Sequence, residues 1–127
     1  MTLMTETQHQ MAVIKWGQQP NIREKWPELK LLYHIPNERK CTPQQGRMFR
    51  LMGVRRGVPD LHLPVARGRY HSLYIEMKRP GGKTSDDQDW WRKQLENQGN
   101  AVVICKGWEE AVLAIEWYFG LEVATRS

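Results

Sequence analysis

The chain has 127 residues, of which 40% are hydrophobic, and its 19 Lys plus Arg against 14 Asp plus Glu give a formal net charge of +5. This length suits one domain with a single core, and it excludes two domains and most large cofactor-binding folds. No apolar run reaches the roughly 18 residues that span a bilayer, and the first residues lack the features of a signal peptide, so we expect a cytoplasmic protein without membrane contact. We expect one domain over residues 1–127, with its core from about 5 to 119 and a short tail from 120 to 127.

The N-terminal half contains two predicted helices and one short predicted strand. Residues 5–8 (TETQ) form a capping-box pattern, so we expect a helix from there to about Trp16. Residues 21–30 are polar and contain a proline, which indicates a short helical turn or a loop. Residues 31–35 (LLYHI) read as a strand, and residues 43–52 form a second helix with Pro in its first turn and Gly just beyond its end.

Residues 59–78 show alternating polarity on both sides of a turn at Arg67–Arg69, which predicts a β-hairpin. A three-residue loop centred on Gly68 would pair Ala66 with Tyr70, and the same register places Asp60 directly opposite Glu76. The apolar face collects Leu61, Leu63, Val65, Leu73, Ile75 and Met77. The polar face collects Asp60, His62, Pro64, Ser72, Tyr74, Glu76 and Lys78.

The C-terminal part is predicted to add a helix, a strand and a last helix. Residues 85–88 (SDDQ) form another capping box and open a helix that runs to Gln98. Residues 101–105 (AVVIC) are an unbroken apolar run, as in a buried strand after a crossover helix, and residues 108–119 form the last helix. The element order predicts an α/β fold in which a mixed β-sheet is flanked by α-helices on both faces.

The last predicted helix carries more apolar residues than one buried stripe needs. The stripe consists of Trp108, Ala111, Val112, Ile115 and Phe119. Leu113, Ala114 and Trp117 fall outside it, which indicates deeper burial or a partner subunit, and we expect a homodimer.

The charge is concentrated between residues 39 and 83, where 11 basic residues accompany two acidic ones, a net of +9 that leaves −4 for the rest. Such a segment favours a polyanionic partner, because each phosphate neutralised by Lys or Arg releases condensed counterions, although a solvated surface would have the same composition. The residues expected to hold phosphates of such a backbone are Arg47, Arg50, Arg55, Arg56, Arg79 and Lys83.

The two carboxylates that the hairpin register brings together predict a metal site. Opposed residues have Cβ atoms about 4.5–5.5 Å apart, so Asp60 and Glu76 could share one cation. Oxygen ligands at this spacing suit Mg²⁺ or Mn²⁺, and the carbonyl of Met77 could supply a further oxygen. Lys78 points to the same side of the strand, where its ammonium could hold or deprotonate a water that attacks a phosphodiester. Neither cysteine belongs to a CxxC pair and the four histidines show no ligand spacing, so a zinc site is not predicted.

Val58–Asp60 (VPD) followed by Ile75–Lys78 (IEMK) resembles the PD-(D/E)xK nuclease signature, and Gln88–Trp91 resembles its QxxW element. With the run Gly53–Leu61 (GVRRGVPDL) and a glutamate on the first helix, the chain resembles the VRR-NUC family, especially its stand-alone phage and bacterial members. The resemblance implies a restriction-endonuclease-like core and metal-dependent DNA cleavage. It further implies selectivity for branched DNA, with four-way junctions cut by a homodimer in a bacterial or phage-infected cell.

The resemblance also assigns roles to individual residues. Asp60 and Glu76 would ligate the metal, and Lys78 would act on the attacking water. Gln88 would support the lysine or the metal-bound water, and Glu6 would reach the metal directly or through water. Two of these residues have a structural alternative, since Gln88 is also placed to cap its own helix and any acid near a helix start, such as Glu6, is favoured by the dipole.

Three other functions are compatible with parts of the pattern. A nuclease for flaps or forks would need the same site. A catalytically silent DNA-binding module would use the basic segment and would bind DNA undiminished by EDTA. A two-carboxylate glycosidase would leave the basic segment and Lys78 unexplained.

Overall fold

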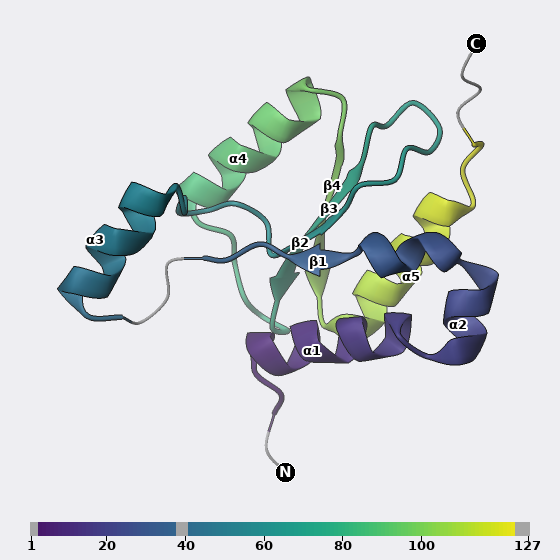
Figure 1. The fold of residues 1–127 in the computed structure, drawn as a ribbon, viewed down its shortest axis with the longest axis horizontal. Helices are drawn as coiled ribbons and strands as arrows, with labels where there is room; N and C mark the ends of the chain where they lie inside the picture. Colours follow the sequence, from purple (N-terminus) through teal and green to yellow (C-terminus); the bar gives the residue numbers. More distant parts are fainter. Residues whose placement is uncertain (1–2, 38–40, 124–127) are drawn as a thin grey trace.

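The computed structural model describes residues 3–37 and 41–123 as a mixed four-stranded sheet with helices on both faces (Figure 1). Arg39 and Lys40 of the basic segment, and residues 124–127 of the predicted tail, lie outside the described residues. None of the helices in the described residues has the length and apolar character needed to cross a membrane.

The helices begin and end close to their predicted limits because their capping residues act as the sequence indicates. Thr5 and Ser85 both form reciprocal capping boxes, and Thr42 forms a third one that was not predicted. Gly53 ends its helix in the left-handed conformation, with φ of 98°. The helices are α1 (Glu6–Gly17), α2 (Pro20–Lys25), the 3-10 helix η1 (Pro27–Leu31), α3 (Pro43–Met52), α4 (Asp86–Asn97) and α5 (Trp108–Phe119).

In the described residues the sheet has the strand order β1-β2-β3-β4, with two antiparallel pairs followed by the parallel pair β3–β4. α4 forms the crossover between these two parallel strands. The strands are β1 (Tyr33–His34), β2 (Leu61–Leu63), β3 (Leu73–Lys78) and β4 (Ala101–Lys106).

The hairpin register is confirmed in the strands and wrong at the turn. Leu61 pairs with Ile75, so one further step along the ladder places Asp60 opposite Glu76. Near the turn, Arg67 instead of Ala66 pairs with Tyr70. The chain after β2 therefore contains one extra residue, because Pro64 has no N–H for the ladder and the next N–H bonds back to the carbonyl of residue 63.

β4 is a strand, as predicted, but it is not fully buried. It lies at the edge of the sheet, and Ile104 is 37% exposed. The apolar run indicated a strand covered on both faces, but Ile104 pairs with Glu76 and therefore lies on the polar face of the sheet, where its side chain stays partly exposed.

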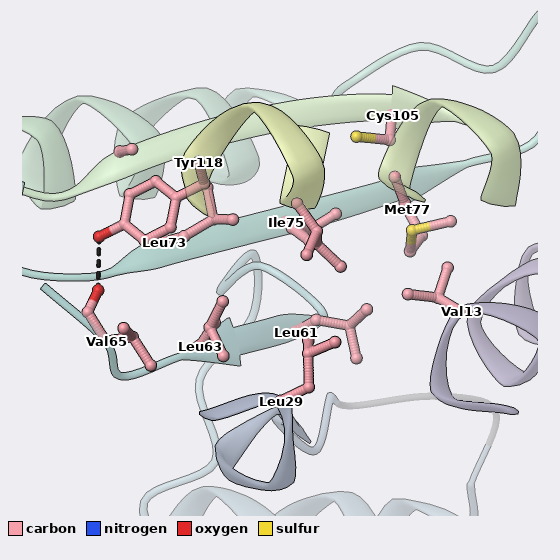
Figure 2. Packing of buried hydrophobic residues seen from close by; sticks show 13 residues of the cluster. Val13, Leu29, Leu61, Leu63, Val65, Leu73, Ile75, Met77, Cys105 and Tyr118 are labelled. Atoms are coloured by element: carbon pink, nitrogen blue, oxygen red, sulfur yellow. Dashed lines mark hydrogen bonds between the residues drawn. The ribbon is translucent and has the colours of Figure 1, made fainter. Parts of the chain in front are cut away.

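The core lies between the apolar face of the hairpin and two helices, α1 and α5 (Figure 2). Val13 enters it from α1, and Ala111 and Ile115 enter it from α5. Tyr118 is also fully buried, and its hydroxyl donates to the carbonyl of Val65 at 2.5 Å. The predicted stripe of α5 did not include Tyr118, whose burial is possible because the Val65 carbonyl accepts from its hydroxyl.

Candidate active site

The polar face of the sheet carries the candidate site. Asp60 lies one residue before β2, and Glu76 and Lys78 both point from β3 toward this face. α4 lies on the same face and brings Gln88 from its first turn to Glu76. All three charged side chains, Asp60, Glu76 and Lys78, are buried. The structure thus brings together the four predicted catalytic side chains.

Asp60 is held by backbone and side-chain donors from three segments. Its carbonyl accepts from the Ile35 N–H at 2.8 Å, its Oδ2 accepts from the Met77 N–H at 2.7 Å, and its Oδ1 accepts from Asn37 Nδ2 at 3.1 Å. In an antiparallel strand the N–H and C=O of one residue point the same way, so the Met77 carbonyl also faces this edge. The register places Pro59 opposite Met77, and a proline offers no N–H to that carbonyl.

Glu76 is 5% exposed and only one of its two carboxylate oxygens has a hydrogen-bond partner. Gln88 Nε2 donates to Oε1 at 2.8 Å, and Lys78 Nζ lies 3.8 Å from the same oxygen. Oε2 is buried without a partner. The pKa of Glu76 is raised to about 8, first by burial and then by the neighbouring Asp60 carboxylate, with a smaller rise from Glu6, while the Lys78 ammonium opposes the rise.

Gln88 caps its own helix, which is one of the two alternatives from the sequence, and it also binds Glu76, while its role toward the lysine or a metal-bound water stays a prediction. Its Oε1 accepts from the Ser85 N–H at 2.8 Å in the capping box, and its Nε2 donates to Glu76. One side chain therefore fixes the start of α4 against β3.

Glu6 is exposed at the start of α1. It influences the charge of Glu76, but within residues 3–37 and 41–123 no three His, Cys, Asp or Glu side chains form a group that could hold a metal ion. The contact of Glu6 with a metal, direct or through water, stays a prediction.

The six predicted DNA-binding residues are all exposed and lie on three segments. Arg47 and Arg50 lie on α3, which projects from the body of the molecule (Figure 1). Arg55 and Arg56 lie on the loop that returns from α3 to β2, whereas the remaining pair, Arg79 and Lys83, follows β3.

A glycine brings the arginine-bearing loop against the start of α4. Gly57 has φ of 93°, and a Cβ there would lie 2.7 Å from the carbonyl carbon of Asp87. Any side chain at this position would push the loop away from the helix that carries Gln88.

Two residues of the site have no evident signature in the sequence. Asn37 donates to Asp60, and His34 Nδ1 lies 2.9 Å from the Asp60 carbonyl. Both belong to the segment around β1, which has no pattern linking it to residues some 25 positions away. Only the observed pairing of β1 with β2 brings them to the site.

A mixed sheet with helices on both faces defines an α/β domain, and two carboxylates with a lysine beside them form a buried polar site on one face of that sheet. A family model described as the VRR-NUC domain matches residues 4–109. A solved structure titled "VRR_NUC domain protein" is similar to this chain, with a TM-score of 0.77 and 29% identity over 96% of this chain and 93% of that one. No curated protein gives a significant match. The chain belongs to the VRR-NUC family of nuclease domains.

Proposed function

We propose that the protein is a metal-dependent endonuclease that cuts branched DNA, and that it resolves four-way junctions as a homodimer. The observation that carries the proposal is the buried pair of Asp60 and Glu76 with Lys78 beside it. Burying two neighbouring carboxylates away from water costs free energy unless a cation binds between them or one of them is protonated. A site that keeps both at this cost favours a catalytic role over a structural one.

The donor set fits Mg²⁺ or Mn²⁺. Asp60 and Glu76 supply carboxylate oxygens, and the Met77 carbonyl faces the same edge without a donor from Pro59. The unpartnered Oε2 of Glu76 is the kind of buried oxygen that a hard cation satisfies. When bound, such an ion would stabilise negative charge on the phosphoryl oxygens and the leaving group.

Lys78 and Gln88 complete the proposed site. The Lys78 ammonium is close enough to Glu76 to be held over the carboxylates, where it can orient the attacking water. Gln88 binds one oxygen of Glu76 and leaves the other for the cation. Gln88 is thus a positioning residue in this proposal.

The exposed arginines of α3 and its loop, with Arg79 and Lys83, supply the contacts to the DNA backbone. Phosphate contacts position a duplex without reading its sequence. This supports selection by DNA structure more than by base sequence.

The proposal of a homodimer rests on the need to cut two strands of a four-way junction. One site cleaves one strand, and symmetric incision of a junction needs two sites related by a two-fold axis. Leu113 is 65% exposed and Trp117 46% exposed on α5, and they offer an apolar surface for such a contact.

The test is incubation with linear duplex, flap, replication-fork and four-way-junction DNA, with Mg²⁺, Mn²⁺, Ca²⁺ or EDTA. We expect metal-dependent cleavage that is fastest on the junction, and binding without efficient cleavage in Ca²⁺ because its geometry is looser. Asp60→Ala and Glu76→Ala are expected to bind DNA without cutting it. Asp86→Ala, which removes an exposed acid from the start of α4, is the matched control. Cleavage that persists in EDTA, or wild-type turnover in either carboxylate variant, contradicts the assigned site.

A further inference from the structure

Three aromatic rings form a row across the sheet beside the carboxylates. Tyr33 pairs with His62 across β1 and β2, and His62 pairs with Tyr74 across β2 and β3. The His62 and Tyr74 rings are stacked, with centroids 4.1 Å apart and an angle of 13° between planes. The Tyr33 ring meets His62 edge-on at 5.3 Å. We call Tyr33, His62 and Tyr74 the aromatic row.

A continuous chain of hydrogen bonds holds two members of the row, Tyr33 and His62, and Tyr74 stacks on the second of them. Asn100 Nδ2 donates to the Leu95 carbonyl, which leaves its Oδ1 to accept from the Ser72 hydroxyl at 2.7 Å. Ser72 Oγ then accepts from His62 Nε2 at 3.0 Å, and His62 Nδ1 accepts from the Tyr33 hydroxyl at 2.8 Å. Each hydrogen bond in this chain has one possible donor once the Ser72 hydroxyl donates to Asn100, so the Tyr33 and His62 rings are held in place before any ligand binds.

The aromatic row lies one step along the sheet from the proposed catalytic site and on the same face. His62 is two residues beyond Asp60, and Tyr74 is two residues before Glu76. Two strand residues span about 6.6 Å, which is comparable to the reach of one nucleotide. α4 packs against β4 at the opposite edge of this face, and Tyr33 is 46% exposed.

We propose that the aromatic row stacks on an unpaired nucleobase next to the phosphate at the carboxylates. The inference rests on the function proposed above and names its substrate class, which is DNA with an unstacked base at a branch point or single-stranded end. A continuous duplex presents no such base, because extrusion would require unpairing and unstacking it. Aromatic side chains bind single strands by stacking on any base, so the contact adds structure selectivity without a sequence requirement.

A cluster of aromatic rings that only stabilises the sheet would show the same contacts between neighbouring strands. Such a cluster gives no reason for the Tyr33 ring to be exposed on the same face as the proposed catalytic site. The two roles differ in one measurable respect: only a stacking surface responds to the presence of a base in the DNA.

The test is equilibrium binding in Ca²⁺ of branched DNA that carries 2-aminopurine, a natural base or an abasic residue at the branch point. For the wild type, we expect the 2-aminopurine fluorescence to change on binding and the abasic DNA to bind more weakly. Tyr33→Ala is expected to lose the fluorescence change and roughly 5- to 150-fold in affinity for DNA with the base, but little for abasic DNA. Tyr33→Phe keeps the ring and is expected to retain both effects.

Equal losses by Tyr33→Ala on base-containing and abasic DNA overturn the stacking role. Failure of the wild type to bind or cut branched DNA refutes the proposed function instead, so the two failures are distinguishable. If Tyr33→Ala does not fold, Tyr33→Leu keeps an apolar side chain on β1 and gives the same comparison.

Discussion

Replacement of Glu76 by glutamine is expected to stabilise the metal-free protein while abolishing cleavage. The Glu76 side chain is buried beside Asp60, and one of its oxygens has no partner. Glutamine has the same shape as the protonated carboxyl group and carries no charge. Glu76→Gln therefore removes the charge that the fold disfavours and a ligand that the proposed metal needs.

The magnitude follows from the pKa. The pKa of Glu76 rises from 4.5 to about 8 on folding, mainly through burial. At about 1.4 kcal/mol per pH unit, this corresponds to at most about 5 kcal/mol against the charged form. Because the folded pKa is the higher one, the cost is absent below pH 4.5, grows as pH rises and is complete above about pH 8. Wild-type stability is therefore expected to fall over this window relative to Glu76→Gln.

The measurement is urea denaturation in EDTA at several pH values for the wild type and Glu76→Gln. Glu24→Gln, which removes one exposed carboxylate from α2, controls for the loss of a surface charge. Added Mg²⁺ or Mn²⁺ is expected to raise the stability of the wild type and not that of Glu76→Gln, because a ligand that binds only the folded state stabilises it. If the difference in unfolding free energy between the wild type and Glu76→Gln is the same at every pH in this range, the reasoning is refuted.

Four further predictions follow from the fold and the proposed site. Lys78→Ala is expected to remove cleavage and leave DNA binding largely intact, whereas Lys106→Ala, at the exposed parallel partner position on β4, keeps most of the activity in the same nicking assay. If the six exposed basic residues each contact one phosphate, log affinity against log salt has a slope of roughly −5, and a flat response in a binding titration excludes this. Tyr118→Phe leaves the buried carbonyl of Val65 unsatisfied and is expected to cost about 1–3 kcal/mol of unfolding free energy, measured by denaturant titration. Light scattering is expected to give about twice the 15.0 kDa chain mass, reduced in Trp117→Glu, and a strict monomer that still makes paired nicks contradicts the dimer.

Local patterns predicted the elements and the hairpin register because each depends on residues close in sequence. The capping boxes at Thr5 and Ser85 fix helix starts within four residues, and polarity alternation fixes which side of β3 faces the core. A slip by one residue would turn the apolar side chains of one strand to the polar face, so alternation restricts the register, and the assumed loop at Gly68 selected the pairing of Leu61 with Ile75. The same register brought the two carboxylates together.

The features that escaped prediction depend on contacts across the whole chain. The position of β4 at the sheet edge depends on strand order, which its own composition does not encode. The role of Asn37 depends on the pairing of β1 with β2, and the burial of Tyr118 depends on an acceptor in the hairpin. The turn near Gly68 escaped because Pro64 adds one residue to one side of the ladder.

The first turn of α4 links the proposed catalytic and DNA-binding parts of the molecule. Gln88 uses one end of its amide to cap the helix and the other to bind Glu76, so displacement of the helix start would break both hydrogen bonds. Asp87, one residue earlier, packs against Gly57, whose loop carries the exposed Arg55 and Arg56. The position of the arginines is therefore coupled through two residues of one helical turn to the carboxylate that would hold the metal. A phosphate contact at the loop and a cation at Glu76 would both favour the same placement of α4, so DNA and metal are expected to strengthen each other's binding.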